Sequence, residues 1–359
     1  MKKSKKHALS FYLIAILIVI SCDIEKKIES PRIKSYLKII SPNSNEIIIK
    51  NDSIRINIIS DSKEKSIKES TVLLNKDTFC FKNKINISTN NLLRYGRYNI
   101  KIRTLFDDGS VEDKSKNIFL YPDQKPKELE YELIKIITHD PETYTQGLLI
   151  DESKYLIESS GQYGKSFIKK VDMESNIIIN KLMIDKKLFA EGITVYNDKL
   201  YMLTWKSKKG LILDKNTLEL IGEFNYSTEG WGLTTIDDNL VMSDGTEKLF
   251  FIDPKSFKIN NYIEVYDNNG KVENINEMEY INDKIYANIY GKDIIAIINY
   301  KTGEVENIIN LEGLLNRENY NTNIDVMNGI AYNLENESIL VTGKWWPSMF
   351  EIKIKEKWI

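Results

Sequence analysis

The alternation of apolar and polar residues predicts β-strands along almost the whole chain. Between residues 31 and 122, short alternating runs such as SIRINIIS, STVLLN and YGRYNIKIRTLF are separated by clusters of Asn, Asp, Ser and Gly. Successive side chains of a strand point to opposite faces, so this period of two indicates antiparallel strands with one buried face. About seven such runs, with FDDGS as a hairpin turn, predict an immunoglobulin-like β-sandwich.

Residues 129–359 repeat one such pattern five times. The segments DESKYLI, YNDKLYM, IDDNLVM, INDKIYA and ENESILV align, and their equivalent positions lie 45, 40, 45 and 54 residues apart. A turn of the form Asp/Asn-x-x-Ser/Thr follows each of the first four, as expected of side chains that cap their own turn. A period in the forties with four strands per unit is typical of a propeller blade, and the length fits five blades.

Two further features complete this division of the chain. The strand LEYELIKII precedes the first repeat and can supply the missing strand of the last blade, which closes the ring and removes its exposed edges. The segment YPDQKPKELE carries two prolines and marks a boundary, with residues 123–128 as the linker. The sequence therefore predicts an all-β protein in which a sandwich at 31–122 precedes a five-bladed β-propeller at 129–359.

The N-terminus has the pattern of an exported protein. Residues 1–21 contain four lysines followed by an apolar run, Phe11 to Ile20, that is too short for a comfortable membrane span. The stretch VISC resembles the bacterial lipobox, so residues 1–21 are expected to be a signal peptide, Cys22 to be lipidated and residues 22–30 to be a tether. An uncleaved anchor with a chance cysteine is the alternative. On the lipobox interpretation the protein is anchored in a bacterial cell envelope.

Composition narrows the possible functions. The formal net charge is −2, so no basic surface suggests a nucleic acid as a partner. After removal of residues 1–21 the only histidine is His139, which excludes a His-rich zinc site. A Ser-His-Asp triad then has a single candidate base, and a metal-dependent hydrolase would need carboxylates for all of its ligands.

Six stretches of the repeat region break the strand pattern: YTQGL, FAEGIT, LTWKSKKG, GWGLT, NEMEY and TGKWWP. They lie beside the start of a blade or within its first strands, so they can share one face of the ring, where a propeller has its central funnel. Taken singly, each has a plainer explanation. A glycine can mark a tight bend, a tryptophan can be packing, and a lone glutamate can be a surface charge.

Taken together, these stretches resemble the glutamine cyclotransferase family, the β-propeller glutaminyl-peptide cyclotransferases of plants and bacteria. The resemblance also includes ESSGQYGKSFIKK, LVMSDGTEKLFFIDP and NGIAY, and it covers about 230 residues that leave out the sandwich and the lipobox. The family closes an N-terminal glutamine into pyroglutamate and releases ammonia. Because the α-amine of the substrate attacks its own γ-carboxamide, the enzyme must supply a proton carrier and a stabilised oxyanion but no nucleophile.

The resemblance implies a role for each matching residue. Glu191 is the general base and acid, and its partly apolar surroundings are expected to raise its pKa. Lys344 is the second catalytic residue, and with Gln146 it is suited to hydrogen-bonding the substrate or the oxyanion. Asn276 grips the substrate amide or α-amine, and aromatic side chains exclude water. The expected substrate-binding residues are Gln146, Tyr144, Phe189, Trp205, Trp231, Asn276 and Tyr290.

Three positions depart from the pattern of the family, and one of them, Ala190 in place of the usual glycine, is a minor change. Tyr144 stands where phenylalanine is usual, and Tyr290 stands where a tryptophan is common, so each keeps a ring and adds a hydroxyl. No cofactor is expected to be required, and a structural metal ion is left open. The expected partners are peptides or proteins with N-terminal glutamine and a membrane reached through Cys22, with the protein as a monomer. The alternative is a non-catalytic propeller lipoprotein that binds a ligand at the cell surface.

Overall fold

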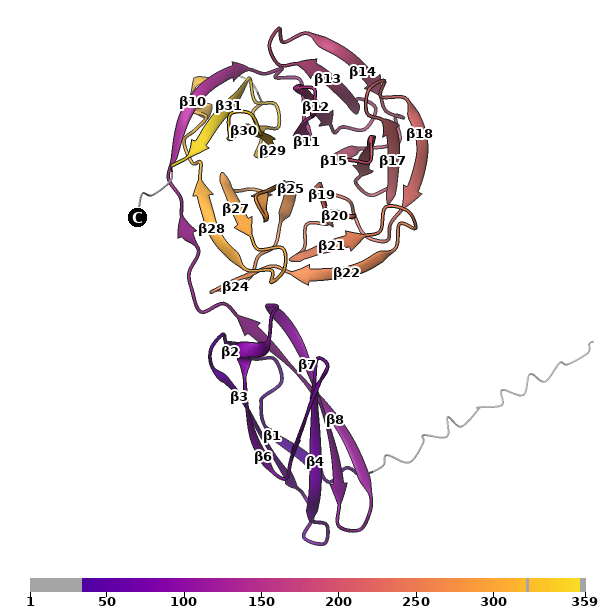
Figure 1. Ribbon diagram of the computed structural model, residues 1–359, viewed down its shortest axis with the longest axis vertical. Helices are drawn as coiled ribbons and strands as arrows, with labels where there is room; N and C mark the ends of the chain where they lie inside the picture. Colours follow the sequence, from indigo (N-terminus) through magenta and orange to yellow (C-terminus); the bar gives the residue numbers. More distant parts are fainter. Residues whose placement is uncertain (1–33, 321–322, 356–359) are drawn as a thin grey trace, which may run out of the picture. The chain divides into compact units, whose positions relative to one another are not determined.

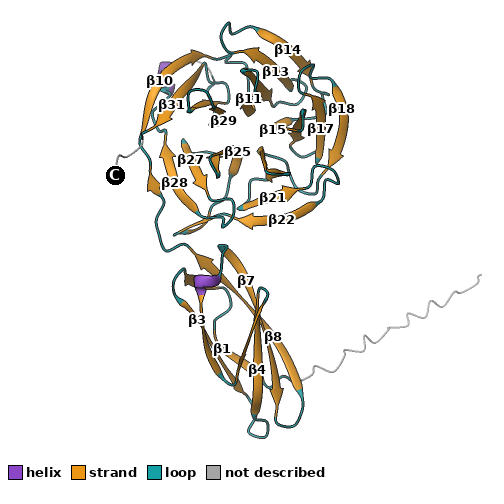
Figure 2. Cartoon of the chain, in the orientation of Figure 1, coloured by secondary structure: helices purple, strands orange, loops and turns teal. Residues whose placement is uncertain are grey.

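The computed structural model describes residues 34–320 and 323–355. These residues form an all-β protein, and the predicted fold class is confirmed (Figures 1 and 2). The expected signal peptide, Cys22 and the tether lie outside the described residues. Within the described ranges, no helix has the length and apolar character needed to cross a membrane.

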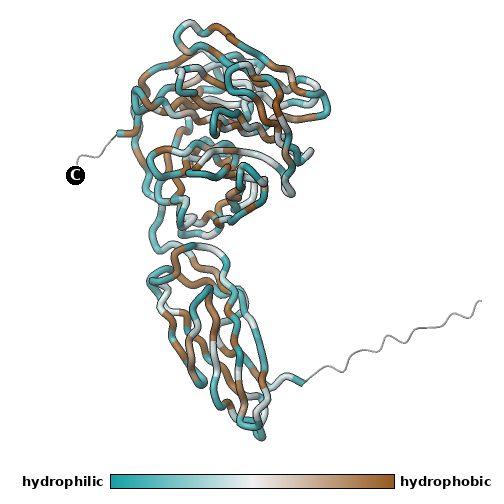
Figure 3. The backbone as a smooth tube through the Cα atoms, turned by 45° about the vertical axis from the view of Figure 1, so that its right-hand side comes forward, coloured by the Kyte–Doolittle hydropathy of each residue, from teal (hydrophilic) through white to brown (hydrophobic). Residues whose placement is uncertain are grey.

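Two sheets with a common core form the sandwich. One sheet has the order β1 (Leu37–Ser41), β3 (Ser53–Ser60) and β6 (Lys84–Ser88). The other has the order β2 (Glu46–Ile49), β8 (Val111–Tyr121), β7 (Gly96–Phe106), β4 (Ile67–Leu74) and β5 (Asp77–Phe81), and β2 runs parallel to β8. A short 3₁₀ helix, η1 (Thr89–Asn91), follows β6. Every second residue of β7 is buried, as the alternation predicts, and Figure 3 shows apolar stretches along these strands with polar turns between them.

Five blades, each with four antiparallel strands, are arranged around a ring, and one blade carries a short fifth strand (Figure 1). The first two blades are β11 (Thr145–Ile150), β12 (Tyr155–Ser160), β13 (Phe167–Asp172) and β14 (Ile178–Met183), then β15 (Ala190–Tyr196), β16 (Lys199–Thr204), β17 (Lys209–Asp214) and β18 (Leu220–Asn225). The third is β19 (Leu233–Ile236), β20 (Asn239–Ser243), β21 (Lys248–Ile252) and β22 (Ile259–Glu264). A ribbon of β23 (Tyr266–Asp267) and β24 (Gly270–Lys271) leads to the fourth, β25 (Ile275–Ile281), β26 (Lys284–Ile289), β27 (Ile294–Ile298) and β28 (Val305–Asn310).

The fifth blade closes the ring with strands from both ends of the propeller sequence. Its strands are β29 (Met327–Asn333), β30 (Ser338–Gly343), β31 (Ser348–Ile354) and, as the outer strand, β10 (Tyr131–Thr138), which is the strand expected from LEYELIKII. A 3₁₀ helix, η2 (Arg317–Asn319), lies between β28 and β29. The short strand β9 (Lys127–Glu128) falls in the expected linker and extends the fourth blade in parallel with β28.

The repeated Asp/Asn turns join the third and fourth strands of the first four blades. In each, the side-chain oxygen of Asp172, Asp214, Asp253 or Asn299 accepts the backbone N–H three residues later, at 2.7, 2.8, 2.6 and 3.3 Å. These bonds satisfy backbone donors that the turn would otherwise leave open. The turn residues therefore serve the blade architecture and lie apart from the candidate site.

Candidate active site

A cavity of about 270 Å³ lies at one end of the propeller ring. Its lining contains all nine residues for which the family resemblance implies catalytic or substrate-binding roles, together with Gln162. Those ten residues are Tyr144, Gln146, Gln162, Phe189, Glu191, Trp205, Trp231, Asn276, Tyr290 and Lys344. They come from all five blades, so closure of the ring brings together side chains that are up to about 200 residues apart in sequence.

The position of these residues in the blades explains why they meet. Gln146, Glu191 and Asn276 are each the second residue of an inner strand, β11, β15 and β25. Trp205, Tyr290 and Lys344 each follow directly after a second strand. In an antiparallel pair, the start of one strand lies beside the end of its neighbour, so both sets lie at the same edge of every blade.

A register shift turns the inner-strand residues toward the cavity. The pairing of the first two strands slips between Thr145 and Gly147 and between Ala190 and Ile193, and the same slip occurs in the fourth and fifth blades. Such bulges bend a strand and re-aim a side chain. The residues at the four slips include Gln146, Glu191, Asn276 and Asn328.

Glu191 is buried among polar and aromatic side chains and is only 4 % exposed. The Gln146 amide donates a hydrogen bond to its Oε1 at 3.1 Å, and the Asn328 amide holds Gln146 through the backbone oxygens of Thr145 and Gln146. Burial raises the pKa of the Glu191 carboxyl well above its usual range. The Lys344 ammonium opposes this rise in pKa, and the Glu229 carboxylate adds to it.

Lys344 faces two tyrosine rings. Its Nζ lies 4.8 Å from the ring centre of Tyr144 and 5.2 Å from that of Tyr290, so both aromatic faces stabilise the cation. Burial lowers the pKa of the ammonium, while Glu191 and Asp325 act in the opposite direction. The Tyr144 hydroxyl, which the family pattern lacks, donates to Asp325 Oδ2 at 3.0 Å. Asp325 therefore stabilises the Lys344 cation directly by its charge, and it also holds the Tyr144 ring that faces this cation.

The apolar wall is held by one carboxylate. Glu229 Oε2 accepts the indole N–H groups of Trp205 and Trp231 at 2.7 and 3.1 Å. Phe189 packs edge-on against Trp205 with ring centres 5.5 Å apart, and Trp231 packs against Tyr290 at 5.9 Å. Two indoles that share an acceptor cannot turn independently, so Glu229 fixes the shape of this side of the cavity.

The stretch NEMEY divides between the cavity and the interior. Asn276 lines the cavity, and within the described part of the chain its buried Oδ1 has no hydrogen-bond donor. Glu277 turns inward, where its carboxyl group accepts backbone N–H groups of Leu148 and Ile330 at 3.4 and 2.8 Å. Glu279 accepts the N–H of Tyr332 at 3.3 Å, and burial raises its pKa to about 8. Asn276 is thus open to a ligand, whereas the two acids tie neighbouring inner strands together.

Comparison with known proteins shows the family of this chain. The family model described as glutamine cyclotransferase matches residues 106–354. The chain belongs to the glutamine cyclotransferase family. A glutaminyl-peptide cyclotransferase of Arabidopsis thaliana is 36% identical over 232 residues, which are 63% of this chain and 72% of the relative. The crystal structure of Myxococcus xanthus glutaminyl cyclase matches with a TM-score of 0.60 and 30% identity, over 64% of this chain and 99% of that one.

Three residues at this site were not predicted: Gln162, Glu229 and Asp325. Gln162 and Glu229 lie inside or beside motifs that the sequence singled out, ESSGQYG and GWGLT. Asp325 lies in no such motif, and its hydrogen bond to Tyr144 and its effect on the pKa of Lys344 become visible only in the structure. Within residues 34–320 and 323–355, no three His, Cys, Asp or Glu side chains are grouped so that they could hold a metal ion.

Proposed function

We propose that this protein is a glutaminyl-peptide cyclotransferase that converts N-terminal glutamine into pyroglutamate, with Glu191 as the proton carrier. The observation that carries the proposal is a buried carboxyl group in a small aromatic cavity, hydrogen-bonded by Gln146 and electrostatically coupled to Lys344. The enzyme class predicted from the sequence agrees with that of the relatives. The cavity volume of about 270 Å³ is at the low end for small-molecule sites, which suits one side chain and its backbone amine.

The reaction needs one proton to travel between two nitrogens of the substrate. The α-amine nitrogen forms a bond to the γ-carboxamide carbon, and the ionised Glu191 carboxylate accepts the proton that this nitrogen loses. The same carboxyl group then donates the proton to the amide nitrogen, whose bond to carbon breaks as ammonia leaves. A carboxyl group with a raised pKa is suited to both steps, because its proton affinity is closer to that of the two nitrogens.

The remaining lining residues supply charge and exclude water. The Lys344 ammonium stabilises the negative oxygen of the tetrahedral carbon, and the free Oδ1 of Asn276 accepts an N–H of the substrate. Trp205, Trp231 and Phe189 cover the reacting group. Covering matters because water would otherwise compete with the α-amine and hydrolyse the amide to glutamate.

The decisive test is the Glu191→Gln variant with a glutaminyl dipeptide as substrate. Ammonia release, or a mass loss of roughly 17 Da, follows the reaction, and the variant is expected to lose at least about a hundredfold in kcat. Glu351→Gln is the matched control, since Glu351 is also buried but bonds Ser338 in the fifth blade away from the cavity. Full activity of Glu191→Gln would refute the assignment of the proton carrier. Absence of turnover in the wild type would instead favour the alternative of a non-catalytic propeller that binds a ligand at the cell surface.

We also propose that Cys22 carries a lipid that anchors the protein, as a monomer, in a bacterial cell envelope. The support is the sequence pattern of residues 1–22 alone. Peptides and proteins exposed at that surface with N-terminal glutamine are then the substrates. Replacement of Cys22 by serine is expected to release the protein from the membrane fraction and to abolish labelling by an alkyne fatty acid.

A further inference from the structure

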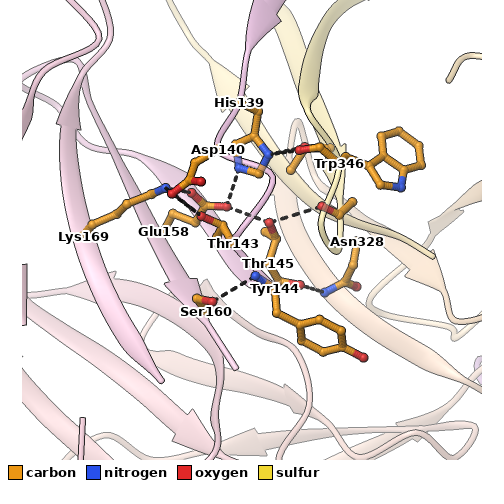
Figure 4. A network of polar contacts seen from close by, with 12 residues as sticks. His139, Asp140, Thr143, Tyr144, Thr145, Glu158, Ser160, Lys169, Asn328 and Trp346 are labelled. Carbon is orange, nitrogen blue, oxygen red and sulfur yellow. Dashed lines mark hydrogen bonds and ion pairs between the residues drawn. The ribbon is translucent and has the colours of Figure 1, made fainter. Parts of the chain in front are cut away.

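Three charged side chains form a buried cluster beside the cavity but outside its lining (Figure 4). Glu158 of β12 lies opposite Lys169 of β13 in the strand pairing, and the Lys169 Nζ is 3.0 Å from Glu158 Oε2. His139, which directly follows β10, places Nε2 at 2.9 Å from Glu158 Oε1. None of the three side chains is more than 5 % exposed. Asp140 lies at the rim of the cluster, 3.9 Å from Lys169.

The hydrogen bonds fix the charge of His139. Its Nδ1 lies 2.6 Å from the backbone oxygen of Trp346, and its Nε2 faces the carboxylate of Glu158. A carbonyl and a carboxylate both accept, so both ring nitrogens must donate and the ring is an imidazolium. Although burial opposes it, His139 and Lys169 lower the pKa of Glu158 to about 2, and Glu158 raises the pKa of His139. One carboxylate therefore stands between two cations.

This cluster holds the first of two segments that carry cavity residues. The Thr145 hydroxyl donates to Glu158 Oε1 at 2.7 Å, and Lys169 donates to the Thr143 hydroxyl at 3.0 Å. These two threonines flank Tyr144, and Thr145 directly precedes Gln146. The backbone at both ends of Tyr144 is thus tied to the same carboxylate, once directly and once through Lys169.

The second segment is the loop that contains Lys344. His139 donates to the oxygen of Trp346, and the Trp345 N–H donates to the oxygen of Thr143 at 2.9 Å. The Thr145 hydroxyl also lies 3.5 Å from the oxygen of Gly343, the residue before Lys344. Glu158 therefore connects the strand start that supplies Tyr144 and Gln146 with the loop that supplies Lys344.

We infer that Glu158 is a positioning residue for the cavity, which sets Gln146 and Lys344 at their places beside Glu191 through Thr145 and His139. The inference rests on the proposed function and deepens it. A buried ion cluster is a poor source of net stability, because desolvation offsets most of the attraction between its charges. Its hydrogen bonds, in contrast, fix geometry, and a displacement of about 1 Å at a reacting group can cost roughly a hundredfold in rate.

The test removes one bond and leaves the charges in place. Glu158→Gln would leave two buried cations without their partner and would endanger the fold. Thr145→Val instead keeps the shape of a fully buried side chain and deletes only the hydroxyl that Glu158 accepts. Thr145→Ser keeps that hydroxyl and loses the methyl group. Thr104→Val is the matched control, because it removes an equally buried threonine hydroxyl, bonded to Ser70, from the sandwich.

Each variant is assayed for ammonia release from a glutaminyl dipeptide and for its melting temperature. Thr145→Val is expected to lower kcat roughly ten- to hundredfold, with little change in KM, because Gln146 no longer holds Glu191 in place. Thr145→Ser is expected to retain most of the wild-type kcat, and Thr104→Val all of it. Equal kcat values for Thr145→Val and Thr104→Val, or equal losses for the two Thr145 variants, overturn the inference. An inactive wild type refutes the proposed function and this inference with it.

Discussion

The Glu229→Gln substitution tests how the aromatic wall of the cavity contributes to activity while Glu191 itself is left unchanged. Glu229 Oε2 accepts two indole N–H bonds, at 2.7 Å from Trp205 and 3.1 Å from Trp231. In Glu229→Gln an uncharged oxygen can occupy the same position. A hydrogen bond to a charged group contributes about 1.5–3 kcal/mol and a neutral one about 0.5–1.5 kcal/mol, so the loss is about 1 kcal/mol per bond. If both losses affect the ordering of the cavity, about 2 kcal/mol corresponds to roughly 30-fold in kcat/KM.

The same variant has a second, electrostatic effect with a defined sign. The Glu229 carboxylate raises the pKa of Glu191, so its removal lowers that pKa. If ionised Glu191 is the base, activity falls at acid pH where this carboxyl is protonated. The acid limb of the profile of kcat/KM against pH is therefore expected to move to lower pH in Glu229→Gln.

The assay is ammonia release from a glutaminyl dipeptide across a pH series. Glu223→Gln serves as the control. Glu223 lies in β18, the strand that precedes Glu229, and its carboxylate pairs with Lys209 rather than with either indole. The control is expected to retain both the magnitude and the pH profile of kcat/KM. An unchanged acid limb in Glu229→Gln would refute the electrostatic reasoning, and unchanged kcat/KM would refute the role of the shared acceptor.

Two further changes test the fold around the site. Gly192→Ala would place a Cβ 2.5 Å from Leu233 N and 2.6 Å from Trp231 O, so we expect a lower melting temperature, a loss of about 1–3 kcal/mol and reduced activity. Burial raises the pKa of Glu279 to about 8, so its contribution to stability is complete below the unfolded pKa and is lost as pH rises toward 8. Glu279→Gln is therefore expected to raise the melting temperature at pH 8 more than at pH 5, and an equal change at both values would contradict the burial argument.

The propeller could be predicted from the sequence because its repeat has a local physical cause. Every blade has alternating strands, the first four also have a turn capped by its own Asp or Asn, and these features recur at similar spacing. The family was also predictable, since its motifs occur in order and the comparisons confirm it. The pairing of β9 with β28 could not be predicted, because a strand of two residues has no periodicity. The roles of the individual site residues stay predictions until the variants are measured.

The charged residues around the site could not be predicted, because the contacts of a side chain are a property of the tertiary structure. Nothing in the sequence gives Glu229, Glu158 or Asp325 a role, although Glu158 lies in ESSGQYGKSFIKK and Glu229 directly precedes GWGLT. Only the closed ring shows that one acid holds two indoles, another lies between two buried cations and the third accepts from Tyr144. The environment of Glu277 in NEMEY could not be predicted for a related reason. Strict alternation puts Asn276 and Glu277 on opposite faces of the strand, but it does not reveal that both faces of this inner strand are buried.

In the first two blades, the register shift and the glycine beside it have one explanation. Glu191 is followed by Gly192, where a Cβ would lie 2.5 Å from the backbone of the next inner strand, and Gln146 is followed by Gly147, where it would lie 2.7 Å from Ile193 N. A side chain larger than hydrogen at either position would push neighbouring blades apart. The polar residue before the glycine is turned into the funnel by the same bulge that brings the backbones together. Close packing at the axis and the orientation of the candidate catalytic groups toward the funnel therefore depend on the same local structure. For this reason, a polar residue followed by glycine at the start of a blade is the most informative local signal in this sequence.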